Sequence, residues 1–218
     1  MSYTKILSIY SLTASFLVLG LAYQNGKLKK GSGPEDAFPV SRQQHQFDYS
    51  GTPIIGDPDA PVTLTVFSEF ECPHCAETAV TLHAIVREYP DKVRVAFKHL
   101  PLNQHQHAKF AAAASMAAHS LGYFEAMHET LFTIQDTLTP DNIRTVAESM
   151  NMDMTAFDQW ADPELWEPLF ERDRREAISA GVQGVPYVFI NGVHHRYPSF
   201  TALKAAIDEI LEKQTPAT

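Results

Sequence analysis

Two cysteines, the only ones among 218 residues, lie three positions apart as Cys72-Pro73-His74-Cys75. Deprotonated thiols are nucleophiles and metal ligands, and a close pair can alternate between dithiol and disulfide. A disulfide closing so short a loop would restrict little chain entropy, so a stabilising role is poorly motivated. A tetrahedral zinc site would need ligands from elsewhere in the chain. The pair therefore favours redox chemistry, with a metal site or two unreactive core thiols as the alternatives.

The residues around the pair predict that it opens a helix. A β-branched, apolar strand is predicted at 62–67, and helical spacing of apolar residues continues from Cys72 to Tyr89. Free N–H groups and the helix dipole at such a start stabilise a thiolate at Cys72. Pro73 suits the first turn because it lacks an N–H, and His74 is expected to favour the thiolate further. Cys75, one turn along, can attack a mixed disulfide and release its partner.

The elements that must position this pair form an α/β pattern. Residues 92–100 alternate as a second strand, which suggests a parallel pair joined by the helix. Several helices follow, one of them with Thr139 as a cap and Pro140 in its first turn. A hairpin with an Asn191-Gly192 turn and a closing amphipathic helix complete the chain. We predict helices at 108–120, 123–134, from 140, 154–160, 163–180 and 200–211, and strands at 187–190 and 193–197.

Two segments together resemble a known family. Phe67-Ser68-Glu69-Phe70-Glu71-Cys72-Pro73-His74-Cys75 resembles the active-site segment of the DsbA-like branch of the thioredoxin superfamily, and Gly184-Val185-Pro186-Tyr187-Val188-Phe189-Ile190-Asn191-Gly192 resembles its cis-proline hairpin. The resemblance covers roughly residues 50–212. It implies a thioredoxin-like fold with a helical insertion, here at about 104–181, between the β-α-β and β-β-α halves.

The resemblance also implies roles. Cys72 would be the nucleophile and Cys75 the resolving thiol, while Pro186 would be cis and Val185 would present backbone groups to a bound peptide. The implied activity is thiol–disulfide exchange, with oxidation of protein dithiols favoured and a reductase or isomerase role as the alternative. Protein or peptide thiols and disulfides, together with a membrane redox partner, are the implied partners. No cofactor and no metal are implied, and the oligomeric state is left open.

One position departs from the family pattern. Many members carry a buried acid six residues before the first cysteine, where this chain has Val66. Such a carboxylate can take the proton of the resolving thiol, so the route of that proton is in question here. Glu69 and Glu71 are not at the matching position, and we expect both to be solvated. Their charge near Cys72 would raise the pKa of that thiol, against the effect of His74.

The N-terminal segment and the net charge indicate where the protein is located and which partners are excluded. Residues 6–23 are uncharged and mostly apolar after Lys5, so we expect residues 1–30 to be a secretory signal or an inner-membrane anchor, which would put the protein in the periplasm or outside the cytoplasm. Residues 31–50 read as a linker and 51–214 as the folded domain. A formal net charge of -9 argues against nucleic acid as a partner.

Other polar groups invite functional readings that we set aside. His105 and His107 fall on a predicted loop and are expected to be solvated rather than metal-bound. The charged run 171–176 is expected to be a solvated helix face with local ion pairs. The aromatic residues of 160–170 are expected to pack the helical insertion.

Overall fold

The computed structural model describes residues 43–195 and 199–214. The expected signal or anchor and most of the expected linker lie outside these residues, as do Tyr197 at the end of the predicted hairpin and the last four residues. Within the described ranges, no helix combines the length and apolar character needed to cross a membrane.

Five strands of the described chain form one mixed sheet, in the order β1-β3-β2-β4-β5. The predicted strand–helix–strand unit is present: β2 (Val62–Ser68) and β3 (Val93–His99) pair in parallel, joined by α2 (Pro73–Glu88). β4 (Tyr187–Ile190) runs antiparallel to β2 and turns back through a hairpin into β5 (Val193–His195). Asn191 and Gly192 both have positive φ, as the predicted turn requires. A side chain on Gly192 would also collide with the backbone of His45.

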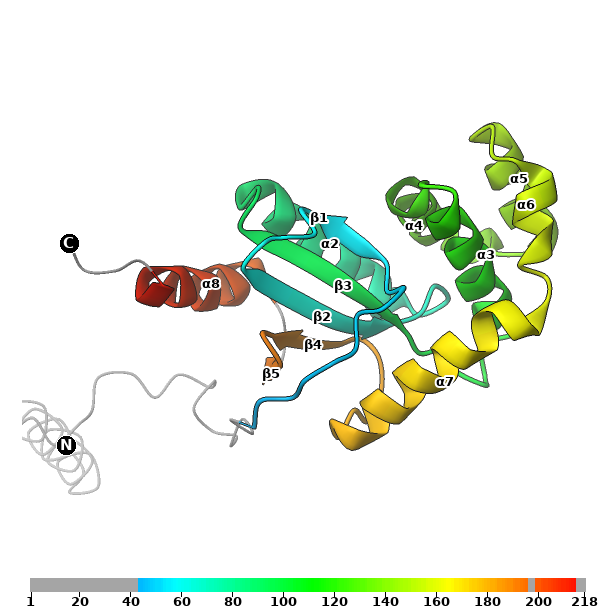
Figure 1. Cartoon of the computed structure of the whole chain (residues 1–218). Coiled ribbons are helices and arrows are strands. Elements are labelled where there is room, and N and C mark those ends of the chain that lie inside the picture. Colours follow the sequence, from blue (N-terminus) through cyan, green and yellow to red (C-terminus); the bar gives the residue numbers. More distant parts are fainter. Residues whose placement is uncertain (1–42, 196–198, 215–218) are drawn as a thin grey trace, which may run out of the picture. The chain divides into compact units, whose positions relative to one another are not determined.

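Alternation along β2 divides the sheet into two faces. Val62, Leu64 and Val66 belong to the main core, which also includes buried residues of α2 and of α8 (Phe200–Gln214). Thr63, Thr65 and Phe67 alternate with them, and Phe67 packs in a second cluster with Phe189. In Figure 1, α2 lies behind the sheet and α8 beside it. The cysteine pair therefore lies at the end of a central strand whose two faces are both covered.

The predicted helical insertion lies between β3 and β4 and comprises α3 (Ala108–Ser120), α4 (Phe124–Thr133), the short 3-10 helix η2 (Gln135–Thr137), α5 (Pro140–Ser149), α6 (Met154–Gln159) and α7 (Pro163–Ser179). Its α-helices begin at the predicted residues or within one of them, and the Thr139 side chain accepts a hydrogen bond from the Asn142 N–H. Buried residues of α3, α4 and α5 join the same core as β2 and α2. The insertion is thus packed against the sheet through a shared core.

The N-terminal boundary differs from our expectation. Residues 44–50, assigned to the linker, already contact the domain: Gln44 forms a β-bridge to Val193, and the Tyr49 hydroxyl shares a hydrogen bond with Thr65. Strand β1 (Ile54–Gly56), which pairs antiparallel with β3, was not predicted at all. A strand of three residues among glycines and prolines is too short to show the alternation of apolar and polar residues that identifies a strand.

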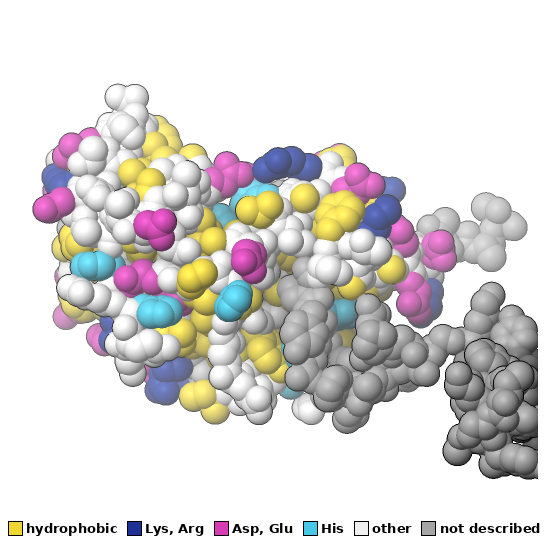
Figure 2. Space-filling model, turned by 180° about the vertical axis from the view of Figure 1, so that it is seen from behind, with side chains coloured by type: hydrophobic (Ala, Val, Ile, Leu, Met, Phe, Trp, Pro, Cys, Tyr) yellow, Lys and Arg dark blue, Asp and Glu magenta, His cyan; other side chains and the backbone are white. Residues whose placement is uncertain are grey.

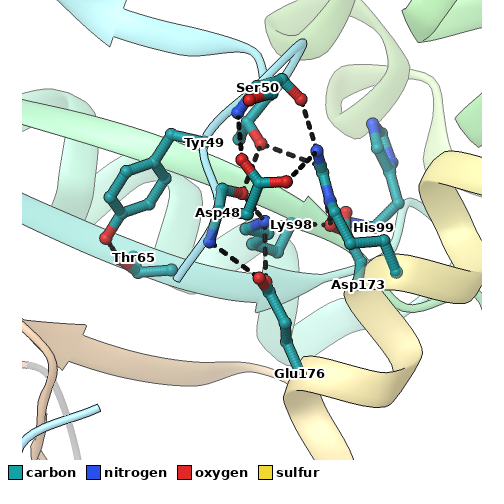
Figure 3. Close-up of polar contacts among 10 residues, drawn as sticks. Asp48, Tyr49, Ser50, Thr65, Lys98, His99, Asp173 and Glu176 are labelled. Carbon is teal, nitrogen blue, oxygen red and sulfur yellow. Dashed lines mark hydrogen bonds and ion pairs between the residues drawn. The ribbon is translucent and has the colours of Figure 1, made fainter. Parts of the chain in front are cut away.

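The expectation that 171–176 is a solvated helix face is wrong for part of it. Asp173 is buried and forms a 3.0 Å ion pair with Lys98, which is itself fully buried on β3. Lys98 Nζ also donates to the Asp48 backbone oxygen at 2.5 Å and pairs with Glu176 at 2.8 Å, as Figure 3 shows. The Glu171–Arg174 pair behaves as expected, with both side chains exposed on α7. We call Lys98, Asp173 and Glu176 the Lys98 cluster.

The face seen from behind carries scattered charges (Figure 2). Acidic side chains and histidines are interspersed with hydrophobic ones, and the described lysines and arginines of that face lie apart from one another. This distribution agrees with the acidic composition of the chain.

Candidate active site

Cys72 is the residue that caps the N-terminus of α2. Its backbone is extended, with φ -84° and ψ 116°, and Pro73 follows as the first helical residue. The Cys72 carbonyl accepts the N–H groups of Cys75 and Ala76 at 3.0 and 3.2 Å. Cys72 therefore occupies the N-cap position of α2, as the sequence predicts, although its side chain makes no capping hydrogen bond.

These surroundings make Cys72 the acidic thiol of the pair. Hydrogen bonding from the Cys75 thiol, helped by the backbone N–H groups of Cys75 and His74, lowers the pKa of Cys72 to about 6. Burial and the negative charge of Glu69 oppose this shift. Cys72 is 7% exposed, so its sulfur lies at the surface edge of the core.

Cys75 is the inner thiol, at 1% exposure. Its hydrogen bond to Cys72 and its burial both raise the pKa of Cys75, while the Ser68 hydroxyl and the Glu69 backbone N–H partly offset them. Both thiols are free in this structure. The pair is therefore asymmetric: an acidic outer thiol and an enclosed inner thiol that keeps its proton.

The second predicted segment lies against the first. The Val185–Pro186 peptide bond is cis. The Cys72 sulfur is 3.8 Å from the Val185 carbonyl oxygen, to which its thiol can donate. This brings together two segments that are 113 residues apart in the chain.

Glu69 and His105 contradict our expectation that both are solvated. The Glu69 side chain is 1% exposed, and its Oε1 lies 2.5 Å from Nδ1 of His105, which is 28% exposed. Its Oε2 accepts the Glu71 N–H at 2.8 Å. Burial raises the pKa of Glu69, although these two hydrogen bonds act against that shift. Sequence reasoning missed this pair because its members are 36 positions apart and nothing local distinguishes Glu69 from Glu71.

Two further contacts join the helical insertion to the segment before the cysteines. Glu71, also expected to be solvated, is half-buried and accepts the His107 N–H at 2.7 Å, at the start of α3. The Gln135 side chain donates to the Phe70 carbonyl at 2.6 Å. With the Glu69–His105 contact, three consecutive residues are fixed by the insertion. The insertion therefore determines where the segment preceding Cys72 lies.

His74 is exposed, whereas Val66 is buried. The His74 side chain is exposed and faces Glu77 at 3.4 Å, so its backbone N–H is the part that acts on Cys72. Val66 is buried and lines a cavity of about 10 Å³ next to Cys75. That cavity has barely the room that one water needs. No carboxyl group lines it; its titratable residues besides Cys75 are His83 and His128.

Within the described residues, neither cysteine belongs to a group of side chains with ligand spacing. Among the described residues, the one group of at least three His, Cys, Asp or Glu side chains with ligand spacing is His83, Glu125 and Glu129. Its two acids are exposed, and Nε2 of His83 lies 3.2 Å from Nδ1 of His128. A metal site built on the cysteine pair thus lacks further ligands in this part of the chain.

Comparison with known proteins gives the class. The sequence model of the thioredoxin family matches residues 48–209, which is most of the chain. The solved structure of a thioredoxin-like oxidoreductase from Silicibacter pomeroyi superimposes with a TM-score of 0.67 at 21% identity, covering 74% of this chain and 93% of that one. BdbD from Bacillus subtilis gives 0.67 at 23% identity, covering 78% and 97%. The catalytic domain of Proteus mirabilis ScsC gives 0.65 at 25% identity, covering 74% and 90%.

The chain therefore belongs to the thioredoxin family. Its helical insertion and its Cys72–Cys75 pair are set in the same fold as the thioredoxin-like oxidoreductase on which it superimposes.

Curated relatives match only in part. The Na⁺/H⁺ antiporter NhaA 3 of Salinispora tropica is 33% identical over 156 residues, which are 71% of this chain but 24% of that protein. NhaA 1 of Salinispora arenicola is 31% identical over the same length and share. The chain thus spans about a quarter of the length of these relatives.

Proposed function

We propose that the chain is an exported oxidant of protein dithiols, which it converts to disulfides through Cys72 and Cys75. A substrate thiolate attacks the Cys72 sulfur of the Cys72–Cys75 disulfide, and the Cys75 sulfur leaves with the electron pair of the broken bond. A second substrate thiolate then attacks the substrate sulfur of the mixed disulfide. This releases Cys72 as a thiolate and the substrate as a disulfide.

The observation that carries this proposal is the asymmetry of the pair. A Cys72 pKa near 6 means that the released thiolate is stable at neutral pH. A stable thiolate favours the reduced protein, and a stable reduced protein is a stronger oxidant. The same asymmetry makes Cys72 the better leaving group and the sulfur that exchanges with substrate.

Val185 supports a place for the substrate. Its carbonyl oxygen lies within reach of the Cys72 sulfur, on the segment that leads into β4. We assign Val185 and Pro186 to binding the backbone of a peptide thiol or disulfide next to Cys72. The substrate is a protein or peptide rather than a small cofactor, and a membrane redox partner reoxidises the pair.

Export rests on the sequence. The apolar stretch of residues 6–23, with its preceding lysine, has the composition of a signal or an anchor. A fusion of the chain to alkaline phosphatase, which is active only outside the cytoplasm, tests it. Activity is expected with residues 1–30 present, and a silent fusion contradicts export.

The direction of electron flow is tested by the reduction potential of the Cys72–Cys75 pair in glutathione buffers. A value close to about -120 mV, as in DsbA, is expected for an oxidant. A value close to about -270 mV, as in thioredoxin, would instead make the chain a reductase or isomerase that needs an electron donor. Cys72→Ser should abolish the redox transition, because it removes one half of the couple.

A further inference from the structure

The proposed reaction names no group that accepts and returns the proton of Cys75. Cys75 is enclosed and keeps its proton, yet it must lose it to attack a mixed disulfide and regain it when it leaves. The position at which the family places a buried acid is occupied by Val66, which has no proton to exchange.

Glu69 is the buried carboxyl group that lies beside the pair. It follows directly after β2, and its side chain is 1% exposed. Its backbone N–H lowers the pKa of Cys75, and its negative charge raises the pKa of Cys72. The residue therefore acts on the inner thiol through its main chain and on the outer thiol through its carboxylate.

His105 gives this carboxyl group a connection to solvent. The 2.5 Å contact between Glu69 Oε1 and His105 Nδ1 can hold its proton on either atom, since a carboxylic acid O–H donates to the ring nitrogen as well as a ring N–H donates to the carboxylate. His105 is 28% exposed, so it can exchange that proton with water.

Among the described residues, the titratable groups that interact with Glu69 are Glu71 on its own segment, His105 from the loop between β3 and α3, and the two cysteines at the start of α2. Glu71 has one carboxylate oxygen committed to the His107 N–H. Of the two histidines that line the cavity next to Cys75, Nε2 of His83 lies 3.2 Å from Nδ1 of His128.

We propose that Glu69 and His105 form the proton-exchange pair for Cys75, in place of the absent acid at position 66. This inference rests on the proposed thiol–disulfide chemistry but not on its direction. During resolution, the Cys75 thiol transfers its proton to the Glu69 carboxylate. The resulting thiolate attacks the Cys72 sulfur, and the partner leaves as a thiolate. During substrate oxidation, the Cys75 thiolate that leaves takes a proton from the Glu69 carboxyl group, which is replenished through His105.

The test follows resolution directly in the full chain. The reduced protein is mixed with excess oxidised glutathione, quenched with acid, and analysed by mass spectrometry for the Cys72–glutathione adduct and the Cys72–Cys75 disulfide. Glu69→Gln keeps the hydrogen-bonding shape of the carboxyl group but cannot exchange a proton. We expect resolution at pH 7 to slow by about 100-fold, the lower range for general acid–base catalysis. We also expect the remaining rate to increase about tenfold per pH unit, as deprotonation by hydroxide requires.

A second readout separates this role from a structural one. Because Glu69 raises the pKa of Cys72, Glu69→Gln should lower that pKa in a titration of thiolate absorbance, while it slows resolution. Structural damage near the pair has no reason to produce both effects. His105→Asn, which keeps a donor near Glu69 but whose amide acts as neither an acid nor a base in water, should slow resolution less than Glu69→Gln.

Glu71→Gln is the matched control. It is the same substitution two residues away, and its amide oxygen can still accept the His107 N–H. Wild-type resolution is expected. A wild-type pH profile in Glu69→Gln would overturn the proposal while leaving the redox function intact. A wild-type chain that forms no adduct with oxidised glutathione would remove the proposed function, and this proposal with it.

Discussion

The molecule buries charge in two places, and the two differ in how the charge is enclosed. The Lys98–Asp173 pair of the Lys98 cluster is sealed, with side chains 0% and 3% exposed, while Glu176 lies at the edge of the cluster at 18%. Asp173 also accepts the His99 N–H and contacts Arg172. The Glu69–His105 pair is open at one end, because His105 reaches solvent. A sealed cluster has no ready path for proton exchange, whereas an open pair does. Burial of a carboxylate therefore does not by itself indicate function; access of its proton to solvent and to a reacting atom does.

The largest expected effect comes from breaking the sealed cluster. Lys98→Met removes the cation that faces both Asp173 and Glu176, and so leaves buried negative charge without that partner. We expect the free energy of unfolding to fall by about 3–5 kcal/mol, measured by urea denaturation. The pKa of Cys72 should stay unchanged.

Lys213→Met is the matched control for this substitution. Lys213 pairs with Glu209 on the exposed side of α8, where solvent screens the interaction. No measurable loss of stability is expected. If Lys98→Met instead moved the pKa of Cys72 as Glu69→Gln does, the distinction between the two regions would fail.

The buried histidines predict how the stability of the protein depends on pH. Burial lowers the pKa of His99 to about 3, and it lowers those of His83 and His128 as well. Groups with a depressed folded-state pKa bind their proton more readily when unfolded. Each neutral buried histidine therefore makes its full contribution to the free energy of unfolding above pH 6.5, the pKa of the unfolded state. Below that pH, the free energy of unfolding falls by up to about 1.4 kcal/mol per pH unit for each such histidine.

His99→Phe isolates one of these groups. His99 Nδ1 has no hydrogen-bond partner among the described residues, and its ring packs against Phe70, Phe97 and Phe170. The slope of the free energy of unfolding against pH reports how many more protons the unfolded state binds than the folded state. Between pH 6.5 and 4, we expect His99→Phe to reduce this number by about one. An unchanged slope would mean that His99 is not neutral in the folded protein.

The two cysteines offer a smaller and more local test. The Cys75 hydrogen bond is the main cause of the low Cys72 pKa, and Cys75→Ala removes it. The pKa of Cys72 should rise by about one unit or more, which corresponds to about 1.4 kcal/mol, in a pH titration of alkylation by iodoacetamide. His74→Gln is the comparison variant, because it retains the backbone N–H. A pKa that rises in His74→Gln but not in Cys75→Ala would move the cause from Cys75 to the His74 side chain.

The sequence could predict the elements that periodic patterns or neighbouring residues determine. The strand–helix–strand unit, the helix capped by Thr139 and the Asn191-Gly192 turn depend on neighbouring residues, and all three are present. Contacts between distant segments could not be predicted in this way. Asp173 and Lys98 are 75 positions apart, and each has the ordinary appearance of a solvated charge in its own segment.

The same reason explains what was missed at the candidate site. The place of Cys72 at a helix start and of Cys75 one turn later is visible in the sequence, and the hydrogen bond from Cys75, helped by backbone N–H groups, lowers the pKa of Cys72. Burial of Glu69 is not, because it depends on His105 at the end of a loop that follows the other parallel strand. Strand β1 was missed for a further reason: its pairing with β3, rather than any pattern of its own, makes it a strand.

The smallest expected effect on stability belongs to the open pair and completes the comparison. Glu69→Gln removes the cost of burying a carboxylate, while its amide oxygen can still accept the Glu71 N–H. We expect the free energy of unfolding at pH 7 to change by less than about 1 kcal/mol, measured by urea denaturation. With Lys98→Met, this gives two opposite results: one variant loses stability and keeps its thiol chemistry, and the other keeps stability and loses fast resolution. A loss of stability in Glu69→Gln comparable to that of Lys98→Met would mean that the Glu69–His105 pair also serves chiefly to hold the fold together.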